Sequence, residues 1–397
     1  MSDNVVRGSG GLLFAVVLLD MVGFGIVIPI LPFISPQLGA SDFDIALIIA
    51  SYSLCAGVVG PWWGRMSDRY GRKPILMVCT TGGALAYAGL ALADQILLFY
   101  LARIFAGLVA GNFAVASAIM ADLTPPAERA RGMGVIGAAF GTGLVLGPFL
   151  GGLLSTADGG FTVPCFLAAG MSLLAVLSAW VFLPESHPPE ARQRSRVAAP
   201  QESLFLLLKR YRSRLILFQF LLHTSCVSAS TYLFPLWVGT YLNWGAREVG
   251  IVFGVQGAIM ALTQGLLMSS LVRVLGEVRL LRICVTFFFL GFALAIFSTT
   301  SVPMVTSVLI ALTGATLCMP VLNSITSQRS AVEHMGKVMG AASSAAAWGR
   351  VLGPVLAGLM LTHFGFSAAW FVFTTFIALY GCWAFSNAPL WRRDTQH

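Results

Sequence analysis

The chain has 397 residues, of which 57% are hydrophobic and only 10% carry a charge. Soluble domains have about 25% charged residues, so this composition excludes a water-soluble protein with a polar surface around one core. The formal net charge is +8, but the basic residues are divided among separate short segments. We therefore expect no nucleic-acid partner and attribute the charge to orientation in a lipid bilayer.

Twelve apolar runs follow one another along the chain, each about 20 residues long and able to cross the bilayer core as a helix. They lie near residues 11–34, 43–63, 74–93, 97–121, 133–155, 161–183, 215–241, 248–271, 280–300, 303–327, 338–362 and 366–387. The first run is too long for a cleaved signal peptide and eleven more follow it, so we interpret it as a span.

The basic residues predict the orientation. With the N-terminus in the cytoplasm, nearly all Lys and Arg residues fall on inner segments, and the exceptions are Arg247 in an outer loop and Arg103 and Arg350 within spans. Because basic loops stay on the cytoplasmic side, we expect both termini there. The seven cysteines lie in or beside spans without metal-ligand spacing, so we expect no disulfide framework, metal site or cofactor.

Two charged residues stand within the N-terminal spans: Asp20 in the first and Arg103 in the fourth. A charge in the bilayer is costly unless it is paired. At 1.5 Å per residue, Asp20 is about 12 Å from the inner boundary and Arg103 about 9 Å from the outer one. Asp20 is therefore either a proton-binding carboxylate that Arg103 modulates, or half of a permanent ion pair that joins two helices.

A dense charge cluster, Gly64-Arg-Met-Ser-Asp68-Arg69-Tyr-Gly71-Arg72-Lys73, separates the second and third runs. The two glycines permit close approach of another helix, and Asp68 is suited to face a helix N-terminus. The alternative is that these charges only mark the inner membrane surface.

The fifth run contains Gly137-x-x-x-Gly141-x-Gly143-x-x-x-Gly147-Pro148-x-x-Gly151-Gly152. Proline removes a backbone hydrogen bond and bends a helix, while glycines permit close packing. The pattern is either a specific functional bend or generic packing of small residues.

The chain divides into two halves. Residues 184–214 are basic and rich in proline, as a flexible linker is. The Gly64 cluster returns as Ser269-x-x-x-Arg273-x-x-Gly276, and Gly147-Pro148 returns as Gly353-Pro354. We therefore predict an all-α membrane protein of twelve transmembrane helices in two pseudo-symmetric six-helix bundles, residues 1–183 and 215–397, with substrate between them.

Polar residues within the C-terminal spans are candidates for the substrate cavity, because lone intramembrane polar groups usually line a cavity. Structural hydrogen bonding is the alternative for each. They are Gln219, His223, Gln256, Asn323, Trp348 and Arg350. Arg350 either holds an anionic group, reaches a cluster of backbone carbonyls or pairs with Asp20 across the halves.

The Gly64–Lys73 cluster resembles the signature between spans 2 and 3 of the major facilitator superfamily. The span-5 glycines and Pro148 resemble those of its drug:proton antiporters, among which tetracycline exporters are nearest. The resemblance implies a latch in which Asp68 docks on the start of span 11 and Arg72 pairs with Asp122, closing the cytoplasmic side. Tetracycline exporters commonly carry another acid in the C-terminal spans, and 280–300 has none.

We accordingly expect a proton-coupled exporter of amphipathic small molecules, either multidrug or tetracycline-like, that works by alternating access. Export of a metabolite, siderophore or lipid-like anion is the alternative, favoured by the two arginines within spans. No motif of a membrane-embedded enzyme is present. We expect a monomer in a bacterial inner membrane, with protons, lipid and a small molecule as its partners.

Overall fold

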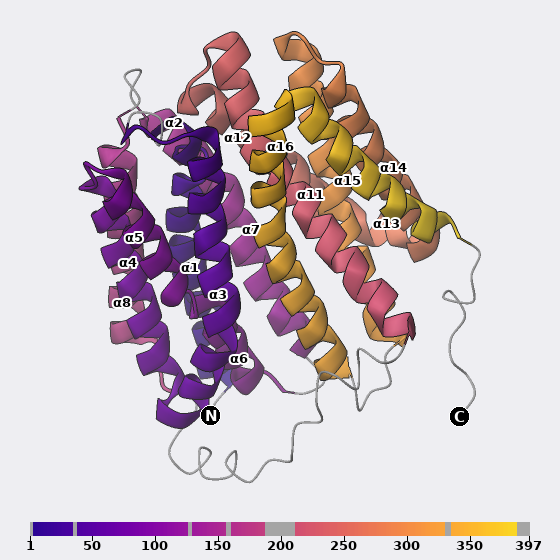
Figure 1. Ribbon diagram of the computed structural model, residues 1–397. Coiled ribbons are helices and arrows are strands. Elements are labelled where there is room, and N and C mark those ends of the chain that lie inside the picture. Colours follow the sequence, from indigo (N-terminus) through magenta and orange to yellow (C-terminus); the bar gives the residue numbers. More distant parts are fainter. Residues whose placement is uncertain are drawn as a thin grey trace. The chain divides into compact units, whose positions relative to one another are not determined.

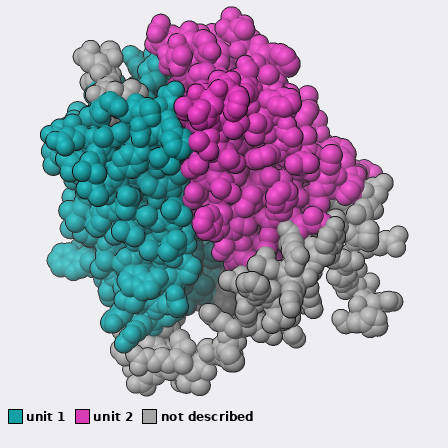
Figure 2. All heavy atoms as spheres, viewed as in Figure 1, with its two compact units in different colours: residues 1–200, 244–257 teal, residues 201–243, 258–397 magenta. Residues whose placement is uncertain are grey.

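The computed structural model describes residues 3–34, 38–125, 129–155, 160–186, 211–329 and 335–386. Regular secondary structure in these ranges is helical throughout (Figure 1). The chain forms two compact units, residues 1–200 with 244–257 and residues 201–243 with 258–397 (Figure 2). Most of the predicted linker, residues 187–210, lies outside the described ranges.

Eleven helical stretches in the described ranges are long and apolar enough to cross a membrane. The last, Val338–Phe385, contains two of the predicted runs. It belongs to α16 (Met335–Phe385), in which Gly365 has φ 81° and ψ 178°, outside the helical region. α16 is therefore two helices joined at Gly365, which agrees with the separate runs 338–362 and 366–387. The prediction of an all-helical membrane protein is confirmed.

The first unit contains the helices of the N-terminal half. They are α1 (Asp3–Val27), α2 (Leu31–Ile34), α3 (Asp42–Tyr70), α4 (Arg72–Ala91), α5 (Ile96–Leu108), α6 (Asn112–Leu123), α7 (Arg129–Leu154) and α8 (Thr162–Phe182). α1 packs against α6, α7 and α8, and α4 packs against α5, α6 and α8. Residues 244–257, including the first part of α12 (Ala246–Leu262), also belong to this unit.

The charged cluster between the second and third predicted runs is mostly helical. α3 continues to Tyr70, and Gly71 alone makes the turn before α4 begins at Arg72. Gly71 has φ 111°, a conformation that a residue with a Cβ rarely adopts. A glycine is therefore required at this point of the signature by the backbone itself.

The fourth predicted run, 97–121, is not one continuous helix. α5 ends at Leu108 and α6 starts at Asn112. The Trp63 indole Nε1 donates a hydrogen bond of 2.7 Å to the Leu108 carbonyl oxygen, which replaces a bond lost at the break. A Cβ on Gly111 would lie 2.5 Å from Trp63 Cγ, so the break is tightly packed.

The second unit repeats the local construction of the first. Its helices are α11 (Tyr211–Leu242), the end of α12 with the π-helical turn η3 (Thr263–Leu267), α13 (Met268–Leu275), α14 (Glu277–Ile296), α15 (Ser301–Arg329) and α16. Gly276 makes the α13–α14 turn with φ 73°, as Gly71 does between α3 and α4. Gly353 packs against the backbone of Ser225 in α11.

Candidate functional site

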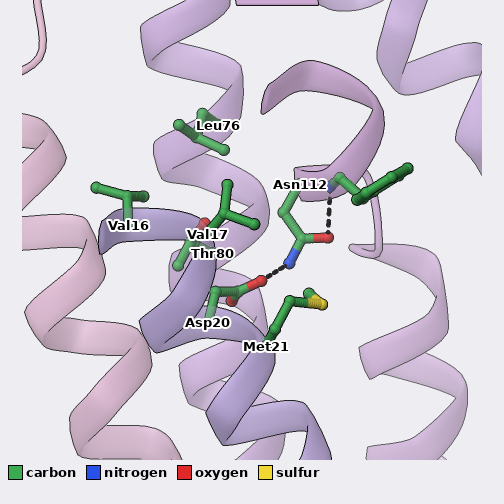
Figure 3. Close-up of a pocket in the computed structure, with 8 residues that line it drawn as sticks. Val16, Val17, Asp20, Met21, Leu76, Thr80 and Asn112 are labelled. Atoms are coloured by element: carbon green, nitrogen blue, oxygen red, sulfur yellow. Dashed lines mark hydrogen bonds between the residues drawn. The ribbon is translucent and has the colours of Figure 1, made fainter. Parts of the chain in front are cut away.

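Asp20 of α1 is buried in the first unit, with 4% of its surface exposed. The Asn112 amide Nδ2 donates a hydrogen bond to Asp20 Oδ2 (Figure 3). Both residues line a small cavity of about 10 Å³, which has room for about one water molecule. The other lining residues are Val16, Val17, Met21, Leu76, Thr80 and Phe113.

Arg103 of α5 is also buried, with 4% exposed, but it forms no ion pair with Asp20. Its guanidinium Cζ lies 4.6 Å from the ring centroid of Tyr52 in α3, and its Nε has no hydrogen-bond partner in the described part of the chain. Buried Tyr87 interacts electrostatically with both Asp20 and Arg103. The two residues of the predicted pair are thus buried separately, with a tyrosine near both.

The glycine pattern of α7 holds α1 close to it beside Asp20. A Cβ on Gly147 would lie 2.5 Å from Gly25 Cα, so only two glycines permit this approach. A Cβ on Gly143 would collide with Met21, which neighbours Asp20 in the chain. A Cβ on Gly151 would collide with the Ile26 carbonyl.

The same pattern also contacts α12. A Cβ on Gly152 would lie 2.7 Å from Gly250 Cα. Pro148 lies within α7, and its ring Cδ would be 3.0 Å from a Cβ on Gly25. The residues of the predicted antiporter motif thus pack at two helix crossings of the first unit.

Arg72 is the centre of the charged cluster. Its Nη1 lies 2.6 Å from Asp68 Oδ1 and its Nε 3.0 Å from Asp122 Oδ2. Nη1 also donates to Ser67 Oγ at 2.7 Å, and the Arg72 backbone N–H donates to Glu185 Oε1 at 2.9 Å. The structure therefore brings three of the predicted latch residues, Asp68, Arg72 and Asp122, into one cluster that joins α3, α4 and α6.

Two other predicted latch residues lie outside this cluster. Arg69 Cζ lies 5.3 Å from the centroid of the neighbouring Tyr70 ring. Around Gly64, no described atom would be within 4 Å of a Cβ. The start of span 11 belongs to the second unit, and the docking of Asp68 on it stays a prediction.

The six predicted cavity residues are divided between the units. Gln256 belongs to the first unit and the other five to the second. Gln219 and His223 are buried in α11, and the His223 ring centroid lies 5.5 Å from that of Phe288. Trp348 is 53% exposed, Arg350 is exposed and Asn323 is half-buried.

Several residues of these sites were not predicted, among them Asn112, Tyr52 and Glu185. Asn112 is a polar residue within an apolar run, directly after Gly111, and this is a signal for a functional position. Glu185 falls in the segment assigned to the linker. The cation–π contact of Tyr52 depends on a helix crossing that the sequence does not specify.

In the described ranges, no group of His, Cys, Asp and Glu residues is arranged to hold a metal ion. All seven cysteines are described and all are free.

The sequence model of the Major Facilitator Superfamily matches residues 13–350 and 237–396. The chain therefore belongs to this superfamily of membrane transporters, and the predicted resemblance is confirmed. It is a multi-pass membrane protein.

Its relatives include proteins named for drug resistance. The class D tetracycline resistance protein of Salmonella ordonez is 30% identical over 377 residues, covering 92% of this chain and 93% of that protein. Multidrug resistance protein 2 of Bacillus subtilis (strain 168) is 26% identical over 382 residues, covering 94% of each.

A solved structure with the same fold is the human organic anion transporter MFSD10. It has a TM-score of 0.72 and 23% identity, with 97% of this chain and 100% of that chain covered. At this identity the likeness supports the fold alone.

Proposed function

We propose that the protein exports amphipathic small molecules, driven by protons that move inward. The observation that carries this proposal is Asp20, a buried carboxyl whose hydrogen-bond donor is the neutral Asn112 amide. Since the described residues give Asp20 no cationic partner within ion-pair distance, the bilayer interior favours its protonation. Asp20 is therefore suited to bind a proton in one state of the carrier and release it in another.

The proposed architecture has twelve spans in two six-helix bundles, residues 1–183 and 215–397, joined by a cytoplasmic linker. The eleven membrane-length stretches and the break at Gly365 support this count. Both termini lie on the cytoplasmic side of a bacterial inner membrane. In this orientation most basic residues fall on cytoplasmic segments, as is usual for membrane proteins. The chain acts as a monomer whose halves rock about a central cavity.

The Arg72 cluster is the proposed latch of the cytoplasmic side. It holds the α3–α4 turn and the end of α6 together through ion pairs with Asp68 and Asp122. In the outward-open state, Asp68 would also contact the start of span 11. The side chain of Asp68 is 45% exposed and thus free to make an additional contact.

Export of drug-like molecules is favoured by the relatives and by the α7 packing. The similar proteins named above confer resistance to tetracycline or to several drugs, as their names state. The glycines of α7 pack directly on α1 beside Asp20, so a movement of α7 would displace the part of α1 that carries the proposed proton site.

A second candidate cargo is an organic anion. Arg103 is buried and has no carboxylate within ion-pair distance in the described ranges. An unpaired buried cation favours an anionic ligand. This observation favours a metabolite or lipid-like anion over a cationic drug.

The test is transport into liposomes that contain purified protein, with an imposed pH gradient and a panel of neutral, cationic and anionic cargoes. Asp20→Asn should abolish uptake that depends on the gradient while the protein stays folded. Asp94→Asn is the matched control, because Asp94 is exposed and should not matter. Transport by Asp20→Asn at the wild-type rate, or wild-type transport without a gradient, would disprove the proposal.

A further inference from the structure

We propose that Asn112 is a positioning residue for the proton site: its amide stabilises the ionised form of Asp20 and thereby sets the pH at which the carrier binds its proton. The inference rests on the proposed proton coupling through Asp20. It assigns a role to a residue that no motif of the chain had marked.

The break in the fourth span places Asn112 opposite Asp20. Asn112 is the first residue of α6 and follows the break at Val109–Gly111. Its Nδ2 donates to Asp20 Oδ2, and its Oδ1 accepts from the Phe113 backbone N–H at 3.0 Å (Figure 3). Because the amide oxygen has its own donor, the amide is oriented with its NH₂ group toward the carboxylate.

The cavity beside this contact offers a second polar group. Thr80 of α4 lines it and is 1% exposed, and its hydroxyl has no hydrogen-bond partner in the described ranges. The cavity thus has a carboxylate, an amide and a free hydroxyl around space for about one water molecule. Such a site is suited to receive one water that delivers or removes a proton. The remaining lining residues named above are apolar, so these three groups decide the polarity of the cavity.

In the described part of the chain, the titratable side chains around Asp20 are few. Cys79 and Tyr87, both on α4, interact with it electrostatically, and the Ser172 hydroxyl of α8 lies near its carboxyl group. Arg103 forms no ion pair with Asp20, and Tyr87 lies near both. None of these neighbours is a positive charge in contact with the carboxylate, so the Asn112 amide has a large relative influence on its protonation.

The expected sign follows from this contact. A hydrogen bond donated to a carboxylate favours the ionised form over the neutral acid. Removal of the amide in Asn112→Leu should therefore move proton binding by Asp20 to higher pH, by about one to two pH units. In Asn112→Asp, which keeps the size of the side chain, two acids compete for the charge and the midpoint should also rise.

The experiment is infrared titration of the purified full-length protein, which follows the carbonyl band of a protonated carboxylic acid and needs no cargo. The band that disappears in Asp20→Asn is that of Asp20, and its midpoint is compared among wild type, Asn112→Leu and Asn112→Asp. Ser117→Ala is the control, since Ser117 lies on the same helix but does not line the cavity. The transport rate is then measured against pH for the same variants.

An upward shift of the midpoint in both Asn112 variants, with the control at the wild-type value, supports the inference. A titrating Asp20 band with an unchanged midpoint in both variants overturns it and leaves proton coupling intact. A wild-type band that does not titrate at all overturns both this inference and the proposed function.

Discussion

At the residue scale, two buried charged residues of the first unit, Asp20 and Arg103, are stabilised by neutral groups, whereas buried Arg72 forms ion pairs. Asp20 accepts from an amide, and Arg103 lies over the Tyr52 ring. Direct pairing would make both charges permanent, because a buried ion pair resists the loss of either partner. Stabilisation by neutral groups leaves each charge free to change its state or its partner.

The contact between Arg103 and Tyr52 leads to a prediction about stability. Tyr52→Leu should lower the free energy of unfolding by about 1–2 kcal/mol, because it removes the ring face from a desolvated cation. Tyr52→Phe keeps the ring and should retain most of the stability. Thermal unfolding in detergent micelles measures both, and equal losses in the two variants would contradict the cation–π explanation.

At the element scale, the α1–α7 crossing depends on the absence of side chains. Gly107, one turn after Arg103, similarly lets α3 approach α5, because a Cβ there would lie 2.5 Å from the Tyr52 carbonyl oxygen. These approaches involve Met21, which follows Asp20 in the chain, and Tyr52, whose ring faces Arg103. The glycines therefore act on the site through the distance between helices.

Gly147→Ala tests this dependence. The new methyl group would meet Gly25 Cα at 2.5 Å. Because its three nearest atoms, in Gly25 and Val22, all belong to the backbone, the helices must separate at a cost of about 1–3 kcal/mol. We expect a lower unfolding temperature and reduced transport. Gly137→Ala on the same helix is the control, because no described atom would lie within 4 Å of its Cβ; equal effects of the two substitutions would refute the packing argument.

At the scale of the whole molecule, the sequence predicted the helical class and the span positions well, because long apolar runs allow few other structures in a bilayer. It did not predict the break at Val109–Gly111, since the apolar run continues through those residues and the break is stabilised by Trp63 from another helix. It also left open whether Asp20 and Arg103 are paired. That outcome depends on side-chain directions at helix crossings, which residue spacing alone does not determine.

The two units carry the same turn with opposite charges. Arg72 follows Gly71 in the first unit, and Glu277 follows Gly276 in the second. Arg72 binds Asp122 through an ion pair, whereas Glu277 Oε1 accepts from the neutral Ser324 hydroxyl at 2.6 Å and the Gln328 amide at 2.9 Å. We infer that the first unit's turn depends on charge, whereas in the described residues the second unit's turn is held by hydrogen bonds from neutral groups.

A double-mutant cycle tests this difference. Arg72→Met and Asp122→Asn should each destabilise the protein, and the double variant should lose less than the sum, because each single change leaves a partly buried charge without its partner. We expect a coupling energy of about 1 kcal/mol, at the lower end for such networks since 26% of the Asp122 side chain is exposed and screened by solvent. Glu277→Gln, which keeps an acceptor oxygen, should change stability by less than about 0.5 kcal/mol.

Unfolding measured at low and high salt distinguishes the two turns: salt should weaken the coupling of Arg72 with Asp122 and leave the Glu277→Gln effect unchanged. Additive losses in the cycle, or a Glu277→Gln effect as large as that of Arg72→Met, would show that the two turns are stabilised in the same way.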